Sequence, residues 1–188
     1  MILATWNVNS ISARLPHVLS FLERVRPNVL CVQETKVPDE RFPRGEIEAL
    51  GYNLEIYGEK SYNGVALITD KPLTDVVRGF PADGPDAQKR MISGIYDGIR
   101  IIDVYIPNGG ELGSDKYAYK LHWLDELACH LRSTYDAHSP LVICGDFNVA
   151  PADIDVHDPV LLKGGVLVSE PERSALERIR EWGLEDVF

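Results

Sequence analysis

The chain has 188 residues and no apolar stretch long enough to cross a membrane, which takes about 18–20 residues. The apolar N-terminal segment, residues 1–7, has no basic residues before it, which argues against a secretory signal peptide. The sequence also has no internal repeat, low-complexity tract or linker. We therefore expect one domain over residues 1–188, with no membrane partner.

Cysteine is scarce, with only Cys31, Cys129 and Cys144 in the whole chain. Two of the three lie in apolar runs, and none has the spacing of a zinc ligand set. Small buried thiols in a reducing compartment are the simplest interpretation, which predicts a cytoplasmic protein.

Positive charge is also in short supply. The chain has 19 Lys and Arg residues against 29 Asp and Glu, a formal net charge of −10. This balance argues against a nucleic-acid partner, because phosphate binding normally requires a basic surface. It does not exclude one, since a local basic face can coexist with acidic surroundings and a carboxylate-rich metal site adds negative charge.

The apolar patterns predict a mixed order of strands and helices. We expect strands near residues 1–7, 29–33, 52–57, 65–69, 73–78, 91–96, 99–105 and 141–146. We expect helices near residues 15–25, 45–50, 121–131 and 169–182. Strands that alternate with helices at first and then follow one another favour a layered α/β sandwich with some antiparallel pairing.

Polar side chains collect at three strand ends. These are Asn7, Glu34, and the pair Asp146 and Asn148 after the apolar run 141–144. Because strand residues alternate faces, Asp146 and Asn148 are expected to point the same way. Oxygen ligands at meeting strand ends suit Mg²⁺ or Mn²⁺ and phosphoryl-transfer chemistry. The alternative for this last segment is an ordinary turn, which also favours Gly, Asp and Asn.

Six segments in order give the chain a family resemblance. They are Thr5-Trp6-Asn7-Val8-Asn9, Val32-Gln33-Glu34-Thr35-Lys36, Tyr62-Asn63-Gly64-Val65-Ala66, Tyr105-Ile106-Pro107-Asn108-Gly109, Lys116-Tyr117-Ala118-Tyr119-Lys120-Leu121 and Gly145-Asp146-Phe147-Asn148-Val149-Ala150-Pro151. With these motifs the chain resembles the exonuclease III group of AP endonucleases, in the endonuclease/exonuclease/phosphatase superfamily.

The resemblance implies a four-layered α/β sandwich of the DNase I-like type. It also implies a Mg²⁺-dependent DNA-repair phosphodiesterase, with Mn²⁺ as a substitute ion. Such an enzyme cleaves 5′ to abasic sites and removes 3′ nucleotides or 3′ blocking groups from duplex DNA. The implied partner is double-stranded DNA with abasic sites or 3′ ends. We expect a monomer in the cytoplasm, associated with the nucleoid if the source is a bacterium.

The resemblance also implies roles for individual residues. Glu34 would hold the metal ion with Asn7 close by, and Asp146 and Asn148 would complete the metal and catalytic group. Asp146 would orient or deprotonate the attacking water, while Asn148 would position that water or the scissile phosphate. Tyr105 would lie near the phosphate, as a hydrogen-bond donor or as an ionised group.

Each of these residues has a plainer interpretation. Asn7 can close a turn after its strand, and Glu34 can be a solvated charge paired with Lys36. Tyr105 can be a core aromatic with a tethered hydroxyl. Asp146 can cap the loop that follows its strand.

Four further residues are candidate DNA contacts: Asn63, Gly64, Arg90 and Lys120. Asn63 and Gly64 suit a close backbone approach to DNA, or else a hairpin turn. Arg90 can contact a phosphate or form a solvated charge pair. Lys120 can contact a phosphate or lie on the surface at a helix start.

The family pattern continues beyond Phe188 with two more motifs, an aromatic-rich segment and a strand ending in an Asp-His pair. We therefore expect the C-terminal strands of the domain to be missing, and the 188-residue chain alone to be poorly stable and nearly inactive. A naturally short, weakened enzyme is the alternative. Two other functions also remain open: a metal phosphodiesterase of the same superfamily acting on RNA or a phosphoinositide, and a non-catalytic DNA-binding scaffold.

Overall fold

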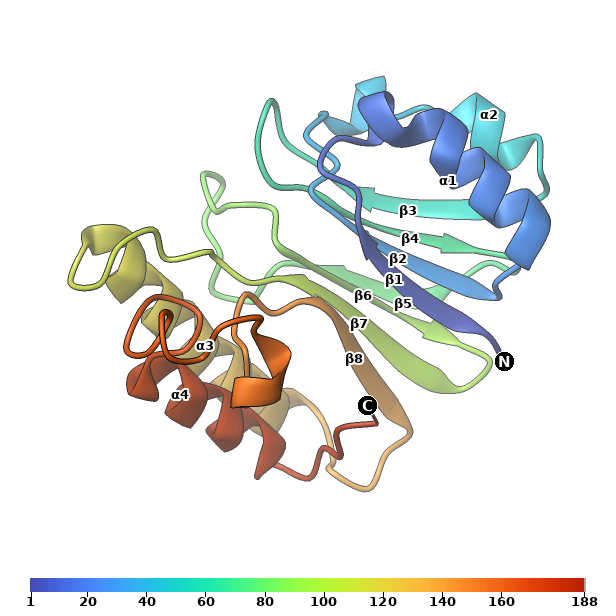
Figure 1. Ribbon diagram of the computed structural model, residues 1–188. Helices are drawn as coiled ribbons and strands as arrows, with labels where there is room; N and C mark the ends of the chain where they lie inside the picture. Colours follow the sequence, from blue (N-terminus) through green and yellow to red (C-terminus); the bar gives the residue numbers. More distant parts are fainter. Residues whose placement is uncertain (188) are drawn as a thin grey trace. The chain divides into compact units, whose positions relative to one another are not determined.

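Two mixed four-stranded sheets dominate the computed structural model, which describes residues 1–187 (Figure 1). The first sheet has the order β1-β2-β4-β3 and the second β5-β6-β7-β8. The strands of the first are β1 (Leu3–Asn7), β2 (Val29–Gln33), β3 (Asn53–Tyr57) and β4 (Val65–Thr69). Those of the second are β5 (Thr74–Arg78), β6 (Met91–Tyr96), β7 (Ile99–Tyr105) and β8 (Leu141–Asp146).

The helices confirm the predicted α/β class. They are α1 (Ile11–Val25), α2 (Arg44–Glu48), α3 (Asp115–Thr134) and α4 (Glu170–Arg180), with short 3₁₀ turns η1 (Asp39–Arg41) and η2 (Asp153–Asp155). Within residues 1–187, no helix is both long enough and apolar enough to cross a membrane.

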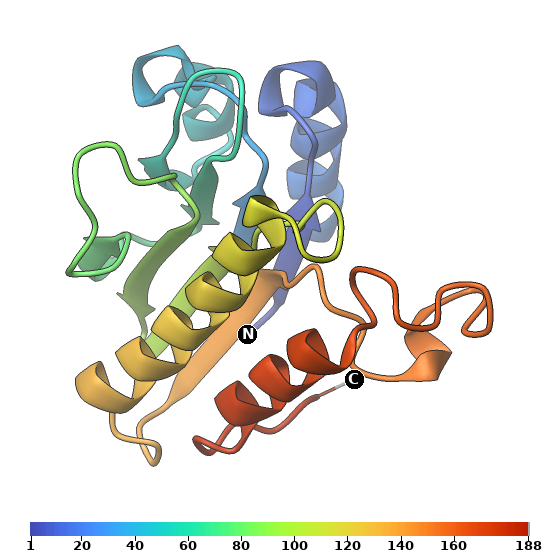
Figure 2. The same cartoon turned by 90° about the vertical axis from the view of Figure 1, so that its left-hand side faces the viewer.

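The chain divides into two compact units, which are described separately below. The sheet unit comprises residues 1–105 and 140–146, with both sheets, α1 and α2. The helical unit comprises residues 106–139 and the chain from 147 onward, with α3 and α4 side by side (Figure 2). The expectation of a single domain over residues 1–188 stays a prediction.

The sheet unit has three layers. Helices α1 and α2 cover one face of the first sheet, and the second sheet covers the other (Figure 1). The helix side of this core includes Val18, Leu22, Ile47, Leu30, Val32 and Ile68. The layer between the sheets includes Val29, Cys31, Val65, Leu67, Ile92 and Ile101. Apolar residues on both faces explain why β2 and β4 read as continuous apolar runs.

Two parallel strand pairs determine where the strand ends that carry the candidate site residues lie. β1 pairs with β2 in parallel, with Asn7 beside Gln33. β7 pairs with β8 in parallel, with Tyr105 beside Asp146. Parallel neighbours end at the same edge of a sheet, so the residues that close or follow these strands gather there.

Helices α1 and α3 begin earlier than predicted, and their first turns already contain a buried residue of the helix, Ile11 in α1 and Tyr117 in α3. α1 begins at Ile11, where the Ser10 hydroxyl accepts the Ala13 N–H. α3 begins at Asp115, where Ser114 caps the Tyr117 N–H in the same way. Capping by a serine hydroxyl satisfies an N–H group that has no partner within the helix.

Gly145 of β8 offers a test of the packing at the end of this strand. A Cβ at this position would lie 2.0 Å from the Val104 carbonyl oxygen of β7, and the backbone φ is +137°. We expect Gly145→Ala to lower the free energy of unfolding by about 2 kcal/mol or more, through overlap and backbone strain. Urea unfolding measures this. The control is Gly84→Ala, because an added Cβ there meets no atom within 4 Å. Equal midpoints for the two variants would contradict the prediction.

Candidate functional site

The side-chain amide of Asn7 joins two carboxylates in the sheet unit. Its Nδ2 donates to Glu34 Oε1 and to Asp146 Oδ2, at 2.8 Å each. Its Oδ1 accepts the Asn9 N–H at 3.0 Å, which fixes which end of the amide faces the acids. The ends of β1, β2 and β8 therefore bring together three of the residues that the sequence selected. This amide–carboxylate group is called the acidic cluster below.

Glu34 is held in its ionised form. It lies just past the end of β2 with φ of 55°, and it forms an ion pair with Lys36 at 2.8 Å. Burial acts to raise the pKa of this carboxyl, but hydrogen bonds from Asn7, Lys36 and Tyr105 outweigh it, and the pKa lies below its ordinary value. The predicted pairing with Lys36 is present, but as one part of this larger group.

Tyr105 ends β7 with a half-buried ring and a hydroxyl that is hydrogen-bonded to Glu34. Burial, followed by the hydrogen bond and the negative charge of Glu34, raises the pKa of this phenol to about 12, with the Arg90 charge opposing. The phenol is therefore protonated at neutral pH. The sequence left two roles open for Tyr105, a hydrogen-bond donor and an ionised group. The protonated state favours the role of donor.

Arg90 contacts both the ring and the backbone of Tyr105. Its guanidinium lies 4.6 Å from the centre of the Tyr105 ring and donates to the Tyr105 carbonyl at 3.0 Å. It also donates to Gln88 Oε1 at 2.6 Å, and the residue is only 8% exposed. This burial corrects the interpretation of Arg90 as a solvated charge pair, while its contact with a DNA phosphate stays a prediction. A stacked cation that donates to the backbone fixes the ring that it covers.

Asn63 and Gly64 hold the loop that carries Glu34. The Asn63 carbonyl accepts the Lys36 N–H at 3.0 Å, and the Gly64 carbonyl accepts the Thr35 N–H at 3.1 Å. A Cβ on Gly64, where φ is +88°, would lie 2.1 Å from Thr35 Oγ1, so glycine is required here. These residues end the β3–β4 connection, as the turn interpretation expected. DNA contact by either of them stays a prediction.

Sequence reasoning missed a buried polar group beneath the acidic cluster. Gln33 donates to Asp103 Oδ1 at 2.6 Å and to Thr5 Oγ1 at 2.9 Å. Burial, then the nearby Cys144, raises the pKa of Asp103 well above its ordinary value. The signal in the sequence was a lone acid in the apolar run of β7. Cys144 also lies 3.3 Å from the buried Cys31, sulfur to sulfur.

Asn148 belongs to the helical unit, and its backbone departs from the prediction. β8 ends at Asp146, and Asn148 has φ of 49°, in the left-handed region. Strand alternation therefore does not reach it, and the expectation that it shares a strand face with Asp146 was wrong. The Asn148 side chain instead donates to the Ile106 carbonyl at 2.9 Å and accepts from Asn108 Nδ2 at 3.2 Å.

Lys120 is completely buried in the helical unit, which corrects both of its predicted roles. Its ammonium forms an ion pair with Glu172 of α4, and it donates to the backbone carbonyls of Asn108 and Asn148. It lies on the inward side of α3, among the buried Tyr117, Trp123 and Leu124. An ammonium in this position presents no surface to a phosphate.

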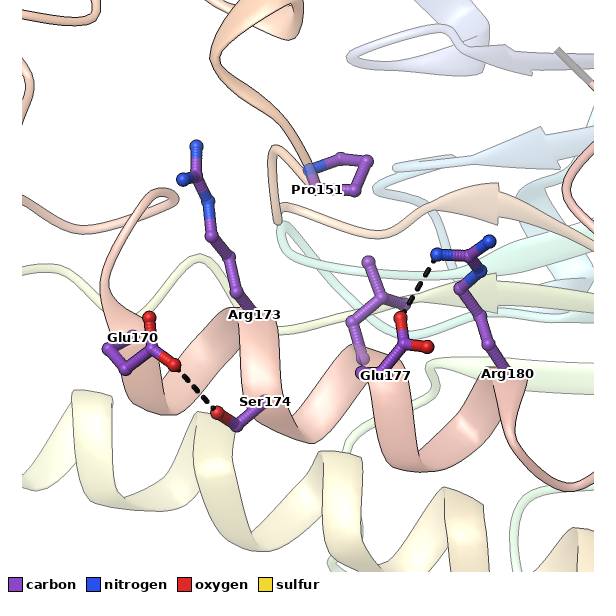
Figure 3. Close-up of a pocket in the computed structure, with 7 residues that line it drawn as sticks. Pro151, Glu170, Arg173, Ser174, Glu177 and Arg180 are labelled. Atoms are coloured by element: carbon purple, nitrogen blue, oxygen red, sulfur yellow. Dashed lines mark hydrogen bonds and ion pairs between the residues drawn. The ribbon is translucent and has the colours of Figure 1, made fainter.

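A pocket of about 260 Å³ lies along α4 (Figure 3). Its lining residues are Pro151, Glu170, Arg173, Ser174, Leu176, Glu177 and Arg180. Pro151 ends one of the motifs of the family resemblance, and none of the seven was a candidate site residue. Both arginines of the lining are paired: Arg180 with Glu177 of the lining at 3.0 Å, and Arg173 with Asp153, which is not a lining residue, at 2.9 Å.

Comparison with known proteins places the chain among relatives of matching fold. The pattern of the Endonuclease/Exonuclease/phosphatase family matches residues 4–172. Exodeoxyribonuclease III of Haemophilus influenzae is 34% identical over 196 residues, covering 98% of this chain and 73% of the relative. The chain thus spans about three quarters of that protein.

Two solved structures are similar over nearly the whole chain. An AP endonuclease from Archaeoglobus fulgidus is 42% identical with a TM-score of 0.92, covering 96% of this chain and 70% of that one. A 3′ phosphatase from Neisseria, solved with a product DNA hairpin, is 37% identical with a TM-score of 0.95, covering 99% and 72%. These matches confirm the predicted DNase I-like α/β fold. By its sequence pattern, its relatives and its fold, the chain belongs to the endonuclease/exonuclease/phosphatase family.

Proposed function

We propose that this protein is a Mg²⁺-dependent DNA-repair phosphodiesterase that cleaves 5′ to abasic sites and removes 3′ nucleotides or 3′ blocking groups from duplex DNA. The observation that carries the proposal is the acidic cluster, in which Asn7 brings Glu34 and Asp146 together at three strand ends. The names of the relatives, exodeoxyribonuclease III and AP endonuclease, support DNA as the substrate.

The donor set of the acidic cluster fits a hard divalent ion. Glu34 and Asp146 supply anionic oxygens that converge on one amide, and Asn7 would keep these two oxygens close together beside the ion. The described residues contain no group of three or more His, Cys, Asp or Glu side chains placed to hold a metal, so the proposed site has two carboxylates and an amide. When bound, Mg²⁺ would stabilise charge on the phosphorus centre and lower the pKa of a coordinated water.

The chain's own residues then have separate tasks. Asp146, oriented by its hydrogen bond from Asn7, would orient the attacking water and accept its proton. Tyr105, as a neutral phenol, would donate a hydrogen bond to a phosphate oxygen. In the helical unit, Asn148 would position the water or the scissile phosphate through its amide.

The net charge of −10 remains the main observation against a DNA substrate. RNA and phosphoinositides also carry phosphate charges, so the net charge does not favour either of these substrates over DNA. A scaffold without chemistry is the third possibility. The acidic cluster argues against the scaffold, because simple DNA binding has no need of two carboxylates held by one amide.

A substrate comparison tests the proposed function. The full-length protein, and not residues 1–188 alone, is incubated with Mg²⁺ and one of four substrates: an abasic duplex, a recessed 3′ end, an RNA duplex or a soluble phosphoinositide. We expect incision 5′ to the abasic site and release of 3′ nucleotides, with the other two substrates left intact. Hydrolysis of the phosphoinositide without cleavage of DNA would contradict the proposal, and binding of DNA without cleavage would favour the scaffold.

Substitution of the two carboxylates tests the metal assignment. We expect Glu34→Gln to raise the Mg²⁺ concentration for half-maximal activity, because a neutral amide is a weaker ligand for a hard cation. We expect Asp146→Asn to lower kcat by about 10²-fold or more, since it removes the proton acceptor. Steady-state kinetics over a range of Mg²⁺ concentrations measures both. Glu48→Gln, at an exposed position on α2, is the control and should match the wild type. Unchanged kinetics in Glu34→Gln would refute the metal assignment.

The Tyr105 phenol gives a pH prediction for the metal-free protein. Its pKa rises from 10.0 to about 12 on folding, so the unfolded chain loses this proton first. Its contribution to stability is therefore complete below pH 10 and is lost as the pH rises to about 12. The difference in phenolate absorbance between wild type and Tyr105→Phe should titrate near pH 12. A difference that titrates at pH 10 would show that the phenol is not held by its surroundings.

A further inference from the structure

The buried ammonium of Lys120 has three acceptors within the helical unit. They are the Glu172 carboxylate, the Asn108 carbonyl at 3.1 Å and the Asn148 carbonyl. A lysine ammonium has three N–H donors, so these three acceptors can take one each. The stem of the side chain lies against Gly109, where an added Cβ would be 3.0 Å from Lys120 Cδ. Lys120 therefore has little room to take another position.

Glu172 is fixed just as firmly at the start of α4. It accepts the Leu167 N–H at 3.0 Å and the Ser169 N–H at 3.1 Å, together with the Ser169 hydroxyl. This arrangement is a capping box, with Ser169 as the N-cap and Glu172 as the third helical residue. The Glu172 carboxylate that neutralises Lys120 is thus held in one position by the backbone at the start of α4.

The two carbonyls that Lys120 holds belong to irregular loops that contact each other. Asn108 Nδ2 donates to Asn148 Oδ1, while Asn148 Nδ2 donates to the Ile106 carbonyl. Asn148 also has a left-handed backbone, which an L-residue adopts only at some cost in energy. Such loops lack the regular hydrogen bonds between strands. A donor that bonds to their carbonyls therefore helps to determine their backbone conformation.

We propose that the Lys120–Glu172 pair is a positioning device for Asn148, which sets the backbone and hence the direction of its amide. This inference rests on the proposed function, in which Asn148 positions the water or the phosphate. Lys120 and Glu172 are positioning residues that act through Asn148, and neither is assigned a contact with the substrate.

Stability alone does not explain why this charged pair is buried. The facing sides of α3 and α4 already carry buried apolar residues, including Leu124, Leu127, Ala175 and Ile179. Replacing a buried ion pair by groups of similar shape is often neutral or even stabilising. What neutral groups of the same shape lack is the set of N–H donors that holds the Asn108 and Asn148 carbonyls.

The test uses a double variant in which both residues become neutral isosteres, Lys120→Met with Glu172→Gln. The introduced glutamine keeps one oxygen for the Ser169 N–H and hydroxyl, while its NH₂ group replaces the oxygen that accepts the Leu167 N–H. The introduced methionine keeps the apolar stem, so the variant loses the ammonium and one acceptor at Leu167. We expect kcat on the abasic duplex to fall tenfold or more, as is usual when the support of a site residue is removed, with KM within twofold. Urea unfolding of the same sample establishes that the variant is folded.

A double-mutant cycle separates positioning from general damage. In an Asn148→Ala background the neutral pair should change kcat by less than threefold, because the amide that it positions is already gone. The single variant Lys120→Arg, which keeps a cation able to donate to both carbonyls, should retain most of the wild-type kcat. A full tenfold loss on top of Asn148→Ala, or a folded neutral pair with wild-type kcat, would overturn the proposal.

The matched control is a second ion pair between the same two helices. Arg178 of α4 donates to Asp125 of α3 at 2.6 Å, with both side chains about half exposed. Asp125→Asn with Arg178→Gln should leave kcat unchanged, because neither residue bonds to Asn108 or Asn148. A loss of kcat equal to that of the buried pair would assign the effect to helix docking in general.

A readout without catalysis separates this proposal from the proposed function. The side-chain amide of Asn148 is followed by ¹⁵N NMR in the wild type, the neutral pair and Lys120→Arg. We expect the neutral pair to shift and broaden the Asn148 signals, while Lys120→Arg stays close to the wild type. If the wild type cleaves no DNA, the proposed function fails and this comparison decides alone. Unchanged Asn148 signals in the folded neutral pair would then refute the positioning role.

Discussion

The two hydrogen bonds from the Asn7 amide to Glu34 and Asp146 are the constraint on which the sheet unit's candidate site depends. They connect the end of β1, the residue after β2 and the end of β8, and so tie the first sheet to the second at one edge. Two carboxylates repel each other unless donors or cations lie close by. The N–H groups of Asn7 and the ammonium of Lys36 supply that compensation. The parallel register of β7 with β8 adds Tyr105 to the same edge.

The helical unit also contains charged groups whose burial requires compensation, but the central group there is a cation. There, a buried ammonium is surrounded by two carbonyls and one carboxylate, and the carboxylate is itself anchored by a helix cap. The units share a design in which a charged group is fixed by groups that are themselves fixed by backbone geometry. Such arrangements lower the reorganisation that a site must undergo when its ligand binds.

Much of the fold followed from local pattern. The strands 65–69, 91–96, 99–105 and 141–146 have the predicted limits, because apolar runs and turn residues mark both of their ends. The acidic cluster was predictable as well, since parallel strands end together. Lys120 was not, because its burial depends on Glu172, which lies 52 residues away. The left-handed backbone of Asn148 was missed for the same reason, since its partners Ile106 and Asn108 come from a distant loop.

The choice of an amide at position 7 also sets the electrical balance of the acidic cluster. Glu34 and Asp146 together carry two negative charges, which equal the charge of one divalent cation. An aspartate in place of Asn7 would bring a third negative charge to the same point and remove the donor that joins the other two. The chain would then need a cation merely to bring these strand ends together. With the amide, the cluster is joined by its own hydrogen bonds, so the arrangement of these strand ends does not depend on a cation.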